Sequence, residues 1–151
     1  MLFAGELKDN QLITQPINFT INQNDLCSSS PWVIESLVLL GNDLGVSLRH
    51  GIPKLQGKDA TYEAFSGKLG IITVTNRTLP SVTYCQLITH EYIHVLQHLN
   101  GNLKSVLPIG WHLTYKQIYS NESLQEAEAY AYQDYIGKVY YSLQKYINPQ
   151  L

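Results

Sequence analysis

The chain has 151 residues, enough for one domain with a buried hydrophobic core. Hydrophobic residues make up 44% and charged residues 15% of it, which is typical of a globular protein and excludes a disordered one. The formal net charge of −2 and the scattered basic residues give no electrostatic basis for nucleic-acid binding. The sequence shows neither a signal peptide nor an apolar run long enough to cross a membrane. We therefore expect a cytoplasmic protein with no membrane partner.

Two cysteines, Cys27 and Cys85, lie far apart in the sequence. A disulfide framework normally needs more cysteines in a chain of this size. The sequence therefore favours two buried free thiols.

The first half of the chain predicts one helix and several strands. Residues 11–22 alternate in part and predict a strand interrupted by a proline. A serine–proline pair and a periodic apolar face predict a helix over residues 31–43. Short strands are expected at 46–48 and 62–65, and β-branched residues make 70–75 the strongest strand of the sequence.

The second half predicts helices. Residues 82–100 have a helical pattern, and Gly101 is a typical stop signal. Residues 102–119 predict a loop that can include a short helix, and apolar residues at helical spacing predict one long helix over 121–146. Together these elements predict a single α+β domain over residues 1–151, with a small, mostly antiparallel sheet.

A metal-binding motif lies within the predicted helix 82–100. Residues 90–94 read His-Glu-Tyr-Ile-His, which matches H-E-x-x-H. Because residues four apart share a helix face, His90 and His94 can present nitrogen atoms to one zinc ion, each about 2 Å away. Glu91 lies at the edge of that face, where its carboxylate can take a proton from a zinc-bound water. The motif therefore predicts one Zn²⁺ per chain and Glu91 as the general base.

The third zinc ligand has several candidates, since catalytic zinc sites usually have three protein ligands. His98 lies one turn further along the same helix, but each step of four residues rotates the side chain by about 40°. We therefore expect His98 to lie beside the site or to be structural. Glu122, Glu126 and Glu128 lie on the predicted final helix, and helical geometry alone does not choose among them.

The segments H-E-Y-I-H at 90–94 and E-A-E-A-Y-A-Y at 126–132 together resemble the gluzincin group of zinc metallopeptidases. Gluzincins combine an H-E-x-x-H helix with a glutamate ligand on a later helix, often within E-x-x-A-[D/N]. The resemblance implies a zincin-like fold, with Glu126 as the third ligand and Ala129 as the small residue between the helices. His98 extends the motif to H-E-x-x-H-x-x-x-H, which is similar to small intracellular zinc proteases of the ImmA/IrrE type.

The resemblance also has implications for the rest of the site. Tyr130 stands where such families often carry an Asp or Asn that orients a ligand histidine, so the partner of His90 is left unassigned. Family members often supply a Tyr, His or Arg to stabilise the oxyanion, which makes His112 and Tyr115 candidates. An edge strand commonly holds the extended substrate, and strand 70–75 is the candidate, with a buried central position as the alternative.

The sequence therefore predicts a zinc-dependent hydrolase that cleaves a peptide bond in a peptide or protein substrate. Cleavage of another amide would use the same chemistry. Two alternatives remain open. One is a non-catalytic zinc-binding structural or interaction module, in which His98 or His112 closes the fourth coordination position. The other is a metal-free interaction protein.

Overall fold

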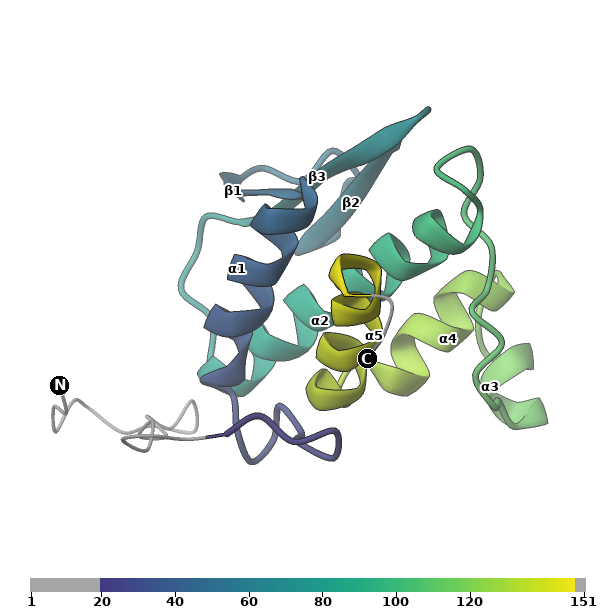
Figure 1. The fold of residues 1–151 in the computed structure, drawn as a ribbon. Helices are drawn as coiled ribbons and strands as arrows, with labels where there is room; N and C mark the ends of the chain where they lie inside the picture. Colours follow the sequence, from purple (N-terminus) through teal and green to yellow (C-terminus); the bar gives the residue numbers. More distant parts are fainter. Residues whose placement is uncertain (1–19, 149–151) are drawn as a thin grey trace, which may run out of the picture.

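The computed structural model describes residues 20–148 and folds them into a helical layer covered on one side by a small sheet (Figure 1). The α+β class is thereby confirmed. The helices are α1 (Val33–Leu44), α2 (Ser81–Asn100), α3 (Tyr115–Tyr119), α4 (Leu124–Tyr132) and α5 (Ile136–Ile147). The strands are β1 (Ser47–Gly51), β2 (Ala60–Phe65) and β3 (Lys68–Thr75).

The sheet has the order β1-β3-β2 and is mixed. β3 pairs with β2 in antiparallel and with β1 in parallel orientation, so the expected mostly antiparallel sheet is wrong for one of its two pairings. The segment 70–75 lies in β3, which is paired on both sides and is therefore the central strand. The expectation that it forms the edge is wrong, because β2 occupies the edge and packs on α2.

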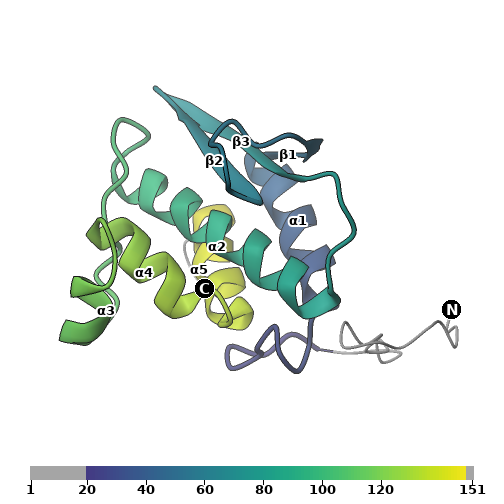
Figure 2. The ribbon, with the colours of Figure 1, turned by 180° about the vertical axis from the view of Figure 1, so that it is seen from behind.

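Helix α2 runs through the middle of the molecule, between the sheet and the helices α4 and α5 (Figures 1 and 2). Its side chains are therefore buried on several faces, among them Ile88, Tyr92, Ile93, Val95 and Leu96. The predicted stop at Gly101 is correct in position. Its φ of −88° is ordinary, and Asn102 and Leu103 adopt the left-handed conformation instead. A Cβ atom at Gly101 would overlap the backbone oxygen of Ser105, so glycine is needed here for close approach of the loop.

The predicted long helix over 121–146 is wrong, because the chain breaks into α4 and α5 between Tyr132 and Ile136. Tertiary hydrogen bonds hold the break. The backbone oxygen of Asp134 accepts a bond from the backbone N–H of Cys27, and its carboxylate accepts bonds from Ser28 and Gln86. The apolar periodicity continues through both helices, so the sequence pattern gives no sign of the change in direction.

A disulfide joins Cys27 to Cys85, so the prediction of two free thiols is wrong. It links the loop before α1 to the first turns of α2, and both residues are fully buried. Counting cysteines could not show that these two positions meet in space. Disulfides persist mainly in oxidising compartments, so the cytoplasmic location stays a prediction that this bond does not favour.

Most of the strand expected over residues 11–22 lies outside the described residues, and residues 20–22 are not in a strand. Over the part of the chain that the structure describes, no helix is long and apolar enough to span a membrane.

Removing the disulfide should lower the stability of the protein. The bond closes a segment of 58 residues, and native disulfides of this kind contribute about 2–4 kcal/mol to the free energy of unfolding. We expect urea unfolding of the Cys27→Ala/Cys85→Ala variant to show a loss of that order. Thiol labelling of the unreduced, denatured chain should find no free thiol, and two labels per chain would contradict the disulfide.

Candidate metal centre

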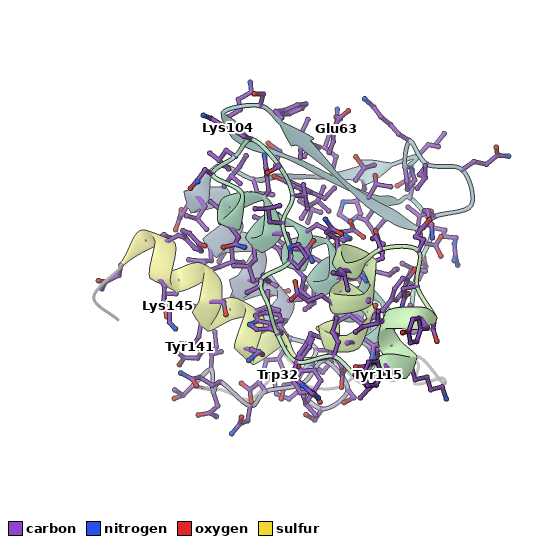
Figure 3. The ribbon with its side chains drawn as sticks, turned by 90° about the vertical axis from the view of Figure 1, so that its right-hand side faces the viewer. Trp32, Glu63, Lys104, Tyr115, Tyr141 and Lys145 are labelled. Atoms are coloured by element: carbon purple, nitrogen blue, oxygen red, sulfur yellow. A yellow bond between two sulfur atoms is a disulfide. The ribbon has the colours of Figure 1, made fainter. Side chains whose placement is uncertain are left out.

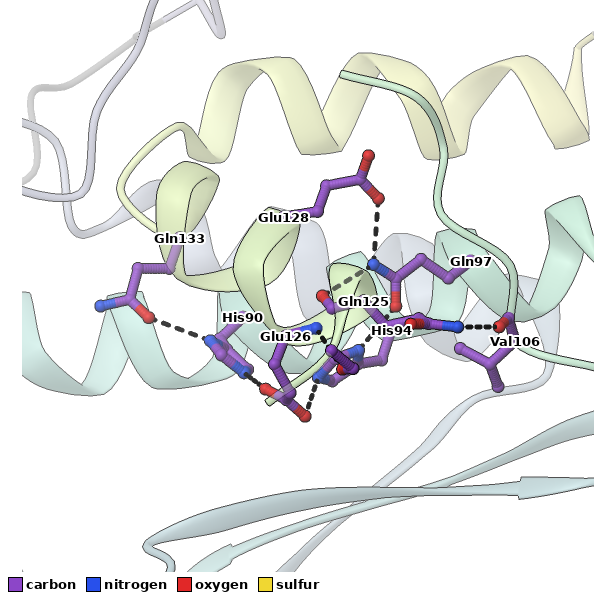
Figure 4. Close-up of polar contacts among 9 residues, drawn as sticks. His90, His94, Gln97, Val106, Gln125, Glu126, Glu128 and Gln133 are labelled. Atoms are coloured by element: carbon purple, nitrogen blue, oxygen red, sulfur yellow. Dashed lines mark hydrogen bonds and ion pairs between the residues drawn. The ribbon is translucent and has the colours of Figure 1, made fainter. Parts of the chain in front are cut away.

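Three side chains from two helices converge at one point between α2 and α4. The Nε2 atoms of His90 and His94 lie 3.1 Å and 3.2 Å from the two carboxylate oxygens of Glu126 (Figure 4). Candidate donor atoms of the three residues all lie within 4.8 Å of one another. Within residues 20–148 this is the one group of three or more His, Cys, Asp or Glu side chains with that geometry. The group could hold a metal ion.

The start of α4 decides which glutamate joins the histidines. Ser123 caps α4, and its hydroxyl accepts a hydrogen bond from the backbone N–H of Glu126. This start places Ala127 and Ala129 in the buried contact and directs Glu126 to the imidazoles. Glu122 lies before the helix and is exposed, and Glu128 is buried elsewhere. Of the three candidates, the structure therefore brings only Glu126 to the pair.

Both histidines are oriented by glutamine side chains, which sequence reasoning missed. The Oε1 atom of Gln133 lies 3.0 Å from Nδ1 of His90, and that of Gln97 lies 2.7 Å from Nδ1 of His94. Amide oxygens accept hydrogen bonds, so each Nδ1 is the donor and each Nε2 is left to face Glu126. Gln97 follows His94 by three positions on the same helix, a spacing that the sequence does show. Gln133 lies in the break after α4, which the sequence does not show.

Glu91 is buried beside the histidines but is not part of the three-residue group. Burial is the main cause of its raised pKa, and the charge of Glu126 acts in the same direction. The charges of His94 and His90 and a hydrogen bond from the backbone of Tyr62 oppose this rise. A carboxylate with a raised pKa binds a proton more readily, as a general base near neutral pH must.

His98 is structural, as expected from its position on the helix. It is 1% exposed, and its Nδ1 atom lies 2.8 Å from the hydroxyl of Tyr62. That hydroxyl also accepts a hydrogen bond from the backbone N–H of Gly70. Because the backbone of Tyr62 also holds Glu91, this one residue of β2 fixes the edge strand to α2 at two points.

The two candidates for oxyanion stabilisation lie away from the metal group. His112 is exposed, and neither it nor Tyr115 is among the residues that line the cleft next to the group. Tyr115 is 78% exposed on α3 and stacks on Tyr119 (Figure 3). Tyr130 does line this cleft, and its ring centroid lies 4.5 Å from that of His90.

The cleft beside the metal group has a volume of about 390 Å³. One wall is formed by the edge strand β2 and the loop before it, and the other by α2 and the segment 122–133. A larger and mostly apolar groove of about 590 Å³ lies elsewhere, between α1, β1 and the start of α2, and none of the three residues of the metal group lines it. Of these two, the smaller cleft therefore combines an opening with the candidate metal ligands.

The charges within the group favour a cation between its members. Hydrogen bonds from His90 and His94 hold the pKa of Glu126 well below its usual value. Burial alone would lower the pKa of His94, but its hydrogen bond to Glu126 and the charges of Glu91 and Glu126 outweigh burial and raise it. Without a metal the site thus attracts protons at the positions where a metal would bind.

The spacing of the donor atoms also fits a metal ion. Ligands about 2.0–2.2 Å from a tetrahedral zinc ion are about 3.3–3.6 Å apart. The separations of 3.1 Å and 3.2 Å between the Nε2 atoms and the carboxylate oxygens are close to that spacing.

Comparisons of the chain with protein-family models, curated proteins and solved structures give no match. The likeness to gluzincins therefore stays a prediction from the two sequence segments.

The metal-free protein should become less stable as the pH rises. A raised pKa of His94 stabilises the fold below the ordinary value of 6.5 and is lost as the pH passes the folded-state value. The raised pKa of Glu91 acts with the same sign from 4.5 upward. We expect chelator-treated protein to unfold at lower urea concentration at about pH 8 than at about pH 6.

Two comparisons check this assignment. The His94→Asn variant should lose part of the pH dependence, because the group with the raised pKa is gone. Added zinc should reverse the trend, because protons and metal compete for the same nitrogen atoms. An equal urea midpoint at both pH values would contradict the charge arrangement.

Proposed function

We propose that the protein is a zinc-dependent peptidase in which His90, His94 and Glu126 hold the metal and Glu91 is the general base. The observation that carries this proposal is the convergence of the three donor groups at one end of an open cleft, with the buried carboxylate of Glu91 beside them. Two imidazoles and one carboxylate form a donor set that is typical of catalytic zinc.

The metal and Glu91 would have different roles in the reaction. A bound zinc ion would polarise the scissile carbonyl and lower the pKa of a water molecule toward about 7. Glu91 then accepts the proton of the attacking water and delivers it to the leaving amine. Its burial and raised pKa suit both transfers, and the bond from the backbone of Tyr62 fixes its carboxylate in place.

The substrate proposal rests on the edge strand. Residues Ala60, Thr61 and Tyr62 of β2 line the cleft opposite the metal group, and β2 has a sheet partner on one side only among the described residues. An extended peptide can pair with such an edge through its backbone, which places a peptide bond near the metal. The role that the sequence suggested for strand 70–75 thus passes to β2.

Tyr130 is our candidate for stabilising the oxyanion. Two tyrosines line the cleft, Tyr62 and Tyr130. The hydroxyl of Tyr62 is engaged by His98 and Gly70, whereas Tyr130 follows the ligand Glu126 by one helical turn and contacts the ring of His90. A phenol at this position can donate a hydrogen bond to the developing negative charge.

Two placements support an open catalytic site over a closed structural one. A closed site needs a fourth protein ligand, for which His98 and His112 were the candidates. His98 is bonded to Tyr62 and His112 lies outside the cleft, and the metal group within the described chain has three members. A tetrahedral zinc ion held by these three residues would therefore keep one coordination position for water or substrate.

A glutamate-to-glutamine exchange at position 91 tests the mechanism. We expect Glu91→Gln to keep about one zinc ion per chain but to lower peptide hydrolysis by about 10²–10⁴-fold, because proton transfer is lost while the ligands remain. The assay combines metal analysis with mass spectrometry of a degenerate peptide library. Glu35→Gln, an exposed exchange on α1, is the matched control and should cleave like the wild type.

Three results would contradict the proposal. They are full activity of Glu91→Gln, unchanged zinc affinity of Glu126→Gln, and a wild-type chain that binds no zinc. Zinc binding without cleavage of any library member would instead favour the non-catalytic zinc module.

A further inference from the structure

Gln97 connects the metal group to the loop that follows α2. It is fully buried, and its Oε1 atom lies 2.7 Å from Nδ1 of His94. Its Nε2 atom donates to the backbone oxygen of Gln125 and to the carboxylate of Glu128, both at 3.0 Å. Its own backbone oxygen accepts a bond from the N–H of Leu107. The side-chain contacts of Gln97 can be followed in Figure 4, and together with its backbone bond they join the candidate ligand to the loop.

Glu128 completes this connection. Its carboxylate is 1% exposed and accepts hydrogen bonds from the backbone N–H groups of Ile109, Gly110 and Trp111 at 2.7–2.9 Å, in addition to that from Gln97. Two bonds reach each carboxylate oxygen. The four donors occupy both oxygens of this buried carboxylate, which acts only as an acceptor here. It thereby holds the segment 106–111 against α4.

The donor and acceptor pattern fixes the tautomer of His94. Glu128 and the backbone oxygen of Gln125 can only accept, so the NH₂ end of the Gln97 amide must face them. The oxygen end then faces His94, whose Nδ1 must donate. A neutral His94 whose Nδ1 donates carries its lone pair on Nε2, the atom that faces Glu126.

We propose that Gln97 and Glu128 are positioning residues that couple the order of the segment 106–111 to metal binding at His94. This inference rests on the proposed zinc site. A folded segment keeps Glu128 and Gln97 in the arrangement that leaves Nε2 free for the metal. By linkage, a metal on Nε2 stabilises the same arrangement and hence the segment.

Gln133 offers an internal comparison. It gives His90 the same kind of amide acceptor, but from the break after α4, at the opposite end of the group from Val106 (Figure 4). Replacing Gln133 should weaken zinc binding without affecting the coupling to the segment 106–111.

Hydrogen exchange of the full chain, with and without zinc, tests the coupling. We expect zinc to slow exchange of the backbone amides of Leu107, Ile109, Gly110 and Trp111, although none of these residues is a candidate ligand. Gln133→Leu should bind zinc about 10–100-fold more weakly, yet zinc at saturation should still slow exchange of these amides.

Two variants distinguish the role of Glu128 from that of Gln97 in this coupling. Glu128→Gln offers one oxygen to four donors and allows the Gln97 amide to reverse, so we expect about 10–100-fold weaker zinc binding and faster exchange of the loop with and without zinc. Gln97→Glu keeps an acceptor for His94 but places a second carboxylate against that of Glu128. The response of the loop to saturating zinc should therefore disappear.

Several outcomes would overturn the proposed coupling between the segment 106–111 and metal binding. Zinc that binds the wild type without changing loop exchange would do so and leave the peptidase proposal intact. The same holds for a folded Glu128→Gln with wild-type zinc affinity, or a Gln97→Glu that keeps the full loop response. Circular dichroism checks that each variant is folded. A wild-type chain that binds no zinc would overturn the proposed function and this inference together.

Discussion

The carboxylate of Glu126 and the Nε2 atoms of His90 and His94 meet where α4 packs across α2. Largely buried polar atoms of this kind are stable only when they share a positive charge, which protons or a divalent cation can supply. Helix α4 packs on α2, and the small side chains of Ala127 and Ala129 are buried on α4. The capped start of α4, the amides that hold the imidazoles and the anchored edge strand all serve to keep these three groups in place.

The residues that orient the two imidazoles carry no charge, and this determines the charge balance of the site. Amides, rather than carboxylates, hold both imidazoles, so the negative charges facing the metal position are those of Glu126 and Glu91. One divalent cation would neutralise both. The third buried carboxylate, Glu128, is directed to backbone N–H groups and sets the orientation of Gln97 from a distance.

The sequence could predict the parts of the site that depend on local geometry. His90, Glu91 and His94 lie on one regular helix, so their spacing alone places them. The choice of Glu126 depends on where α4 begins and ends, and tertiary contacts of the loop around Cys27 impose that break. The mixed sheet and the disulfide depend on pairings between distant segments, which periodicity does not encode. Glutamine supports are hard to foresee, because a helical glutamine is common and carries no distinctive pattern.

Strand β2 lies upstream of every group that would touch the metal. The three candidate ligands and their supports all come from the stretch between His90 and Gln133, whereas the strand that faces them belongs to an earlier part of the chain. Under the proposed function, metal affinity and the selection of a peptide substrate would therefore be encoded in separate stretches of sequence. Changes upstream can alter what the cleft accepts while leaving the inorganic chemistry intact, a division that would let selectivity evolve independently of the metal.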